Sequence, residues 1–277
     1  VLGFYGMILS LISILILPFV GLKVLLFGWP IALLIIVTYG FINAKKIITN
    51  NIYIRSKKLS KNYRLAFISD VHLGSQNINH FKAIINLIKD QSGDAILIGG
   101  DLIDSSSFDL NELTFLKEIE VPILFVTGNH EFYLKNAKEK LNQLIEFNIN
   151  VIDYSIFELN EINVIGLGDY CSSQEKIGFL KTLDPSDRFS ILLVHKPSLW
   201  TESKDYCDLM LSGHTHAGQL FPFQMFVKLQ FPFYYGFKCF EGTYGYVSSG
   251  AGCWGPQNRI GSSNEVVIIH LNSEKLI

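Results

Sequence analysis

Histidine, aspartate and asparagine side chains gather in five short segments, each placed directly after a run of apolar residues. In chain order the segments are Asp70-Val71-His72, Gly100-Asp101-Leu102-Ile103-Asp104, Gly128-Asn129-His130-Glu131, His195 and Gly213-His214-Thr215-His216. They hold five of the seven histidines of the chain. Because the carboxyl ends of parallel strands meet at one edge of a sheet, we expect these side chains to converge there.

Each segment taken alone has an ordinary explanation. A single aspartate after a strand is usually a turn former or a helix cap, and a single histidine is usually a hydrogen-bonded polar residue. Together, however, the carboxylates and imidazoles would leave buried polar groups unpaired unless cations lay among them. Mixed oxygen and nitrogen ligands suit Mn²⁺, Fe or Zn²⁺ better than Ca²⁺, so the sequence predicts a transition-metal site.

Short apolar runs alternate with helical patterns from Arg64 onward, which favours an α/β fold with a parallel sheet and later antiparallel hairpins. The predicted helices cover 78–90, 109–119 and 135–147, and a hairpin over 157–168 turns at Asn160-Glu161. The predicted strands cover 65–69, 95–99, 123–126, 191–194, 209–211, 244–248 and 266–271.

The order of the five segments resembles the calcineurin-like metallophosphoesterase superfamily over roughly residues 64–271. The resemblance implies a four-layer α/β/β/α sandwich and two divalent metal ions, with manganese expected before iron or zinc. It also implies a hydrolase that cleaves a phosphoester or pyrophosphate by attack of a metal-bridging hydroxide. The expected substrate is phosphorylated, with a lipid and a lipid-linked nucleotide as candidates.

The resemblance also assigns roles to individual residues. One metal ion would be held by Asp70, His72 and His216. The other would be held by Asn129, His195 and His214, with Asp101 bridging the two. His130 would stay free of metal beside the leaving group, oriented by Asp104, although a helix cap remains an alternative role for Asp104.

Residues 213–219, 246–250 and Gly255-Pro256 resemble a bacterial membrane-anchored branch of this superfamily. That branch includes cell-envelope phosphodiesterases and a UDP-2,3-diacylglucosamine pyrophosphohydrolase of lipid A synthesis. The chain departs from its pattern at Ala217, where glycine is usual, and at Asn264, where proline often stands. We expect Arg259 to bind a substrate phosphate, and a surface salt bridge is the alternative.

The N-terminal residues 1–44 are predicted to form a transmembrane hairpin, because each of the runs Leu2–Val20 and Val24–Ala44 approaches the ~20 residues that cross a bilayer. Residues 45–63 are interpreted as a basic linker and 64–277 as the phosphoesterase domain. The basic residues after the second run favour a multi-pass protein of the cell membrane with its catalytic domain in the cytoplasm. The chain starts at Val1 rather than at Met, which is compatible with further spans before it.

Composition bears on the possible partners of the protein and on the state of its cysteines. A net charge of −2 argues against a nucleic-acid partner, and four cysteines without a Cys-x-x-Cys pair are read as reduced thiols. The aromatic segment 220–237 is interpreted either as a lid packed on the core or as a surface that enters the membrane. A non-catalytic interaction scaffold is the alternative function, disfavoured because every matched metal-ligand position keeps a competent side chain.

Overall fold

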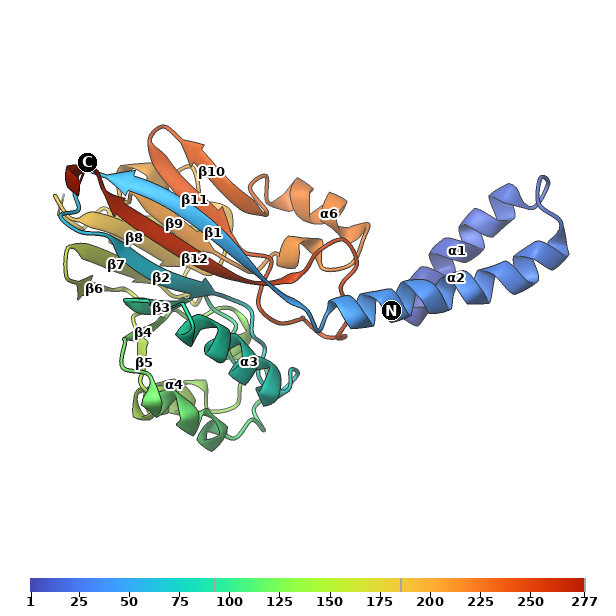
Figure 1. Ribbon diagram of the computed structural model, residues 1–277, viewed down its shortest axis with the longest axis horizontal. Coiled ribbons are helices and arrows are strands. Elements are labelled where there is room, and N and C mark those ends of the chain that lie inside the picture. The colour runs from blue at the N-terminus through green and yellow to red at the C-terminus, as the bar shows by residue number, and fades with distance from the viewer. Residues whose placement is uncertain (92, 185, 277) are drawn as a thin grey trace.

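A computed structural model describes residues 1–91, 93–184 and 186–276 of the chain (Figure 1). Positions 92, 185 and 277, which belong to the expected domain 64–277, lie outside the described residues.

The first of two six-stranded sheets has the order β1-β12-β2-β3-β4-β5. Strand β12 runs antiparallel to β2, and the other neighbours in this sheet are parallel. The strands are β1 (Ile47–Ser56), β2 (Tyr63–Ile68), β3 (Ala95–Ile98), β4 (Ile123–Phe125), β5 (Ile149–Val151) and β12 (Asn264–Ser273). The sheet therefore brings the ends of β2, β3 and β4 to one edge.

The second sheet has the order β10-β11-β9-β8-β7-β6 and is also mixed. The pairs β6–β7 and β10–β11 are antiparallel hairpins, and the hairpin predicted to turn at Asn160-Glu161 is confirmed. The strands are β6 (Ser155–Leu159), β7 (Ile162–Leu167), β8 (Phe189–Val194), β9 (Leu209–Ser212), β10 (Gly236–Phe240) and β11 (Thr243–Val247).

The two sheets pack face to face through residues such as Phe67 of β2 and Leu193 of β8. On the outer face of the first sheet lies α3 (Ile78–Lys89), because its apolar residues recur on one side of the helix. Those residues are Phe81, Ile84, Ile85 and Ile88. The second sheet packs its outer face against Leu180 of α5 (Ser173–Leu180). The predicted α/β fold is thus confirmed, with two mixed sheets.

Two predicted helices differ in detail. The region 109–119 forms a 3₁₀ helix over Leu110–Glu118, with Asp109 as its cap. The region 135–147 divides into α4 (Ala137–Gln143) and a 3₁₀ turn over Leu144–Phe147.

Two N-terminal helices form a hairpin that projects away from the sheets (Figure 1). Only α2 (Leu22–Asn43) is both long and apolar enough to cross a membrane among the described residues. Helix α1 (Leu2–Ile16) has 15 residues, or about 22 Å, which is shorter than the ~30 Å hydrocarbon core. The multi-pass expectation is therefore not supported: the structure has one apolar helix of spanning length.

The interpretation of residues 45–63 as a linker is wrong for most of its length, because 47–56 form β1. This strand pairs in parallel with β12 and buries Ile52 and Ile54 between the sheets. In the sequence, the alternation at Ile52 and Ile54 indicates a strand, although basic residues surround it. As a result, only residues 44–46 separate α2 from the first sheet.

The end of α2 is also hydrogen-bonded to the loop that precedes β12. Asn43 Nδ2 donates to the carbonyl oxygens of Arg259 (3.1 Å) and Ser262 (2.8 Å), and the Arg259 N–H donates to Gly40 O (2.9 Å). Asn264, one of the departures from the family pattern, donates from Nδ2 to Ala44 O at 2.6 Å. These bonds hold the helix end and the loop together.

Candidate metal centre

The seven predicted metal ligands come together from both sheets. Three loops of the first sheet carry Asp70 and His72 after β2, Asp101 after β3, and Asn129 after β4. The second sheet supplies His195 after β8, with His214 and His216 after β9. The expected convergence of strand ends is therefore what the fold produces.

Two buried His/Asp clusters form where these loops meet. In the first, His72 Nε2 lies 3.1 Å from His216 Nε2, and Asp70 Oδ1 lies 3.6 Å from His216 Nε2. The ligand atoms of Asp70, His72 and His216 all lie within 4.8 Å of one another.

The second cluster has the same character. His195 Nε2 lies 3.1 Å from His214 Nδ1 and 3.2 Å from Asp101 Oδ2. Two nitrogens bound to one ion at 2.0–2.1 Å, in tetrahedral or octahedral geometry, are about 2.8–3.4 Å apart. Both imidazole pairs have this spacing, and the two clusters together are consistent with a dinuclear metal site.

Asn129 supplies a further oxygen at this site. Its Oδ1 atom is buried, and no hydrogen-bond donor reaches it within the described part of the chain. The next residue, His130, donates its backbone N–H to Asp101 Oδ1 at 2.9 Å, which fixes the Asn129 turn against Asp101. Because buried polar atoms normally have partners, an orphaned amide oxygen fits a metal ligand.

The backbone of the site is strained. Five of the seven predicted ligands have positive φ angles in the left-handed region that side chains other than glycine rarely adopt. The values are 54° for Asp70, 56° for His72, 51° for Asp101, 72° for His214 and 49° for His216. Such strain concentrates where a site demands a fixed geometry.

Glycine at position 128 is required by the same geometry. A Cβ atom there would lie 2.1 Å from Asp101 Oδ1 and 2.6 Å from Asp101 N. The Gly128-Asn129 turn can therefore approach Asp101 only without a side chain at its first position.

Burial and neighbouring charges shift the pKa values of the cluster in opposite directions. Burial is the largest single effect and lowers the pKa of His195, but the charge of Asp101, the hydrogen bond to it and the charge of Asp70 together raise the pKa to about 10. Burial and the charge of His195 lower the pKa of His214 to about 3. Burial, His72 and Arg259 lower the pKa of His216 as well. His214 and His216 are thus held in the neutral form that binds metal ions.

His130 contacts Asp104 through its Nδ1 atom. Its Nε2 atom lies 3.9 Å from Asp101 Oδ2, and the side chain keeps some exposure to solvent. Burial lowers the pKa of His130, but the bond to Asp104 and the charge of Asp101 raise it above its usual value. The alternative role of Asp104 as a helix cap is not seen, since Asp109 caps the 3₁₀ helix that follows.

Arg259 lies beside His216 rather than at the surface. It is fully buried, and its Nη2 atom lies 3.2 Å from His216 Nδ1. Its Nη1 atom donates to His216 O at 3.3 Å and to Ser262 Oγ at 3.1 Å. A side chain enclosed in this way makes no surface salt bridge in the part of the chain that the structure describes, and its contact with a substrate phosphate stays a prediction.

Sequence reasoning assigned no role to Glu131, although it belongs to the third polar segment. Its buried carboxylate accepts the backbone N–H groups of Asp101 (3.1 Å), Ile103 (2.9 Å) and Gly128 (2.7 Å). Burial and the charge of Asp101 raise its pKa to about 7. Glu131 therefore holds the loops after β3 and β4 together.

One part of the aromatic segment 220–237 packs on the core, and another part is an exposed apolar surface. Phe233 is buried against Trp200, with ring centroids 4.8 Å apart, and belongs to the core. Helix α6 (Phe223–Gln230) instead exposes Met225, Phe226 and Leu229 to solvent. It lies against the N-terminal hairpin, since Phe4 and Phe223 have ring centroids 4.9 Å apart and the Tyr5 hydroxyl donates to Phe221 O at 2.7 Å.

Comparison with known proteins agrees with the geometry. The family model for calcineurin-like phosphoesterases matches residues 63–218. An uncharacterized metallophosphoesterase of Campylobacter jejuni is 36% identical over 230 residues, covering 78% of this chain and 61% of that protein. A Danio rerio protein named as a transmembrane protein with a metallophosphoesterase domain is 30% identical over 263 residues, covering 86% of this chain and 60% of its own length.

A Thermus thermophilus crystal structure matches with a TM-score of 0.46 and 14% identity, covering 69% of this chain and 89% of that one. The chain spans about three fifths of the length of the Campylobacter and Danio relatives. The family model covers more than half of the 277 residues and includes all seven predicted metal ligands. The chain therefore belongs to the calcineurin-like phosphoesterases.

Proposed function

We propose that this chain is a membrane-anchored hydrolase of phosphoesters or pyrophosphates that uses two divalent metal ions. The observation that carries the proposal is two pairs of facing imidazoles, His72–His216 and His195–His214, in each of which the facing nitrogens lie 3.1 Å apart beside a buried carboxylate. When bound, the two ions supply Lewis acidity that ionises a water molecule near neutral pH and offsets the charge of the phosphoryl group.

We assign the ligands as the family resemblance implies. Asp70, His72 and His216 hold one ion, and Asn129, His195 and His214 hold the other. Asp101 bridges them: its Oδ2 atom faces His195, and its Oδ1 atom is held by the His130 N–H. Manganese is the proposed metal, with iron and zinc as alternatives for the same donor set.

His130 is the proposed general acid. Asp104 accepts a hydrogen bond from Nδ1, which fixes the ring orientation and leaves Nε2, 3.9 Å from Asp101 Oδ2, to act on the reacting group. Both carboxylates near the ring favour its protonated form, so Nε2 carries a proton that it can give to a departing alkoxide. Asp104 acts through His130 and is a positioning residue.

The membrane part of the proposal is supported by α2 and α6. Helix α2 has the length and composition of a membrane span, and Lys45 and Lys46 follow it directly, which favours a cytoplasmic catalytic domain. Helix α6 begins seven residues after His216 and exposes Met225, Phe226 and Leu229 beside the hairpin. An apolar surface next to both the span and the metal clusters favours a lipid phosphoester as substrate.

A pyrophosphate bond in a UDP-linked diacylated sugar is a specific candidate within this class, because the same metal-ion chemistry serves monoesters, diesters and pyrophosphates. A non-catalytic scaffold is disfavoured, since each proposed ligand position carries a side chain able to bind metal.

The test is a reconstitution assay. The full chain in detergent is stripped of metal with a chelator, loaded separately with Mn²⁺, Fe²⁺ or Zn²⁺, and assayed on bis(p-nitrophenyl) phosphate, phospholipids and UDP-linked acylated sugars. We expect two metal equivalents and turnover that depends on them. A protein that takes up no metal and cleaves nothing would support the scaffold instead.

A further inference from the structure

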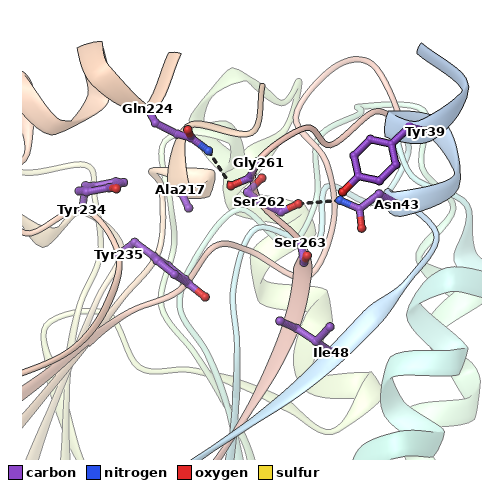
Figure 2. A pocket seen from close by; sticks show the side chains of 10 residues that line it. All are labelled: Tyr39, Asn43, Ile48, Ala217, Gln224, Tyr234, Tyr235, Gly261, Ser262 and Ser263. Carbon is purple, nitrogen blue, oxygen red and sulfur yellow. Dashed lines mark hydrogen bonds between the residues drawn. The ribbon is translucent and has the colours of Figure 1, made fainter. Parts of the chain in front are cut away.

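A polar cavity of about 270 Å³ lies between the end of α2 and the loop that follows the last metal ligand (Figure 2). Tyr39 and Asn43 of α2 form one side of it. Tyr234 and Tyr235, from the segment before β10, form the other, and the Ala217 methyl group lies between the two sides.

The lining of the cavity is uncharged but rich in hydrogen-bonding groups. No Asp, Glu, Lys, Arg or His side chain lines it among the described residues. The amide nitrogens of Asn43 and Gln224 are already used, since they donate to Ser262 O at 2.8 Å and to Gly261 O at 2.6 Å (Figure 2). Among the described residues no hydrogen bond reaches their amide oxygens, which can therefore accept from a ligand.

Three hydroxyl groups of the lining are also free. Within the described chain, the side-chain oxygens of Tyr39, Tyr234 and Ser263 make no hydrogen bond, whereas the Tyr235 hydroxyl donates to Glu265 Oε2 at 3.4 Å. The wall thus offers both donors and acceptors beside flat aromatic rings. Such a surface suits a neutral ligand with several hydroxyl groups, because every ligand hydroxyl can both donate and accept.

The position of the cavity indicates which chemical group such a ligand would carry. Ala217, which lines the cavity, directly follows His216, a member of the first His/Asp cluster. The cavity and this cluster are therefore formed by adjacent residues. Tyr39 and Asn43 lie in the last two turns of the apolar helix, and Lys45 and Lys46 come next in the chain. Tyrosines and lysines at the end of a span mark the level of the lipid head groups.

We propose that this cavity binds the uncharged, hydroxyl-rich part of the substrate, a glycerol or sugar unit esterified to the phosphate that the metal centre hydrolyses. The proposal rests on the proposed phosphohydrolase function. A membrane lipid carries such a head group at the level of Tyr39, and a soluble glycerol or sugar phosphodiester carries the same chemistry.

Binding to the metal-depleted full chain in detergent tests the proposal without relying on catalysis. Native mass spectrometry compares phosphatidylglycerol with phosphatidylmethanol of the same acyl chains, because the two differ in the head-group hydroxyls. A third arm uses soluble glycerophosphoglycerol. We expect phosphatidylglycerol to bind about tenfold more tightly than phosphatidylmethanol, as two or more hydrogen bonds would give.

The double variant Tyr39→Phe/Tyr234→Phe removes two free hydroxyls and should reduce the preference to about twofold or less. Ser263→Phe fills the cavity and should abolish the preference for phosphatidylglycerol. Tyr53→Phe is the matched control, because Tyr53 is an exposed tyrosine of β1 that does not line the cavity. It should keep the full preference.

Equal binding of the two lipids by the unmodified chain would overturn the proposal, as would an equal loss in Tyr53→Phe. If glycerophosphoglycerol binds as tightly as phosphatidylglycerol, the hydroxyl recognition stands and the source is a soluble diester. A head-group preference without turnover of any phosphoester would count against the hydrolase function alone. Turnover of bis(p-nitrophenyl) phosphate without a head-group preference would count against the cavity alone.

Discussion

The guanidinium of Arg259 lies against the ring of His216, with Nη2 3.2 Å from Nδ1, while the backbone N–H of the same arginine donates to Gly40 O of α2. One residue therefore connects the apolar helix with a proposed metal ligand. The contact lies on the side of the imidazole away from His72, whose Nε2 faces His216 Nε2.

Replacing Arg259 should weaken metal binding. In Arg259→Met, His216 loses the hydrogen bond that its backbone carbonyl oxygen accepts and a positive charge that keeps the pKa of its ring low, so protons compete better for the ring. We expect metal affinity to fall about 10–100-fold, as for other groups that orient a ligand. Competition with a fluorescent chelator measures it. Arg188→Met, which removes a partly exposed arginine just before β8, is the control and should leave metal affinity unchanged.

Asp101→Asn should remove the proposed bridge with little change in shape. The amide keeps the volume of the side chain but loses the charge that faces His195. We expect metal content to fall from two ions to one or fewer per chain and turnover to fall below a few per cent. Elemental analysis and circular dichroism report on metal and fold. Asp109→Asn, at the cap of the 3₁₀ helix, is the matched control. Full activity in Asp101→Asn would contradict the assignment.

His130→Gln should separate acid catalysis from metal binding. We expect both metal ions to remain and kcat to fall about 10²–10⁴-fold for a substrate with an alkoxide leaving group. A p-nitrophenolate leaving group needs no proton, so the loss there should be small. Asp104→Asn should give the same leaving-group dependence with a smaller loss, because Asp104 acts on the reaction through its contact with His130 Nδ1. Equal losses on both substrates would argue that His130 binds metal instead.

Glu131→Gln should destabilise the fold. The carboxylate accepts three backbone N–H groups, and a glutamine would place its own NH₂ group against one or more of these donors. We expect a loss of about 1–3 kcal/mol in the free energy of unfolding. Thermal unfolding in detergent measures the change. Glu118→Gln, at an exposed position, should leave the midpoint within error of the unmodified chain.

The exposed face of α6 should matter only for lipid substrates. The variant Met225→Ser/Phe226→Ser/Leu229→Ser removes the apolar surface that faces away from the domain core. We expect turnover of a phospholipid in vesicles to fall about five- to tenfold and hydrolysis of bis(p-nitrophenyl) phosphate to stay unchanged. Ile145→Ser, at an exposed apolar position outside α6, is the control. A loss on both substrates would show that α6 supports the fold.

The site was largely predictable from the sequence because its ligands follow apolar strands closely. Asp70 stands two positions after the end of β2, and His195 one position after the end of β8. Strand ends are read from local pattern, and parallel strands bring them to one edge. The strained backbone of these residues leaves no such local pattern, and only the structure reveals it.

Long-range contacts account for most of what the sequence did not predict. The place of Arg259 depends on distant partners, because its backbone bonds to Gly40 and Asn43 of α2, more than two hundred residues earlier, and its side chain contacts His216. The role of Glu131 depends on backbone groups of two neighbouring loops, and β1 depends on pairing with β12. The cavity beside Ala217 could not be predicted for the same reason, since its walls come from both ends of the chain.

The connection of three residues between α2 and β1, together with the bonds from Asn43 and Asn264, leaves the sheets little freedom to swivel on the apolar helix. In a chain anchored by α2, the catalytic pocket would sit at one height above the bilayer and face one direction. Encounter with a lipid would then be a lateral search in two dimensions. A molecule diffusing in from the aqueous phase would have to match an orientation that the protein cannot adjust.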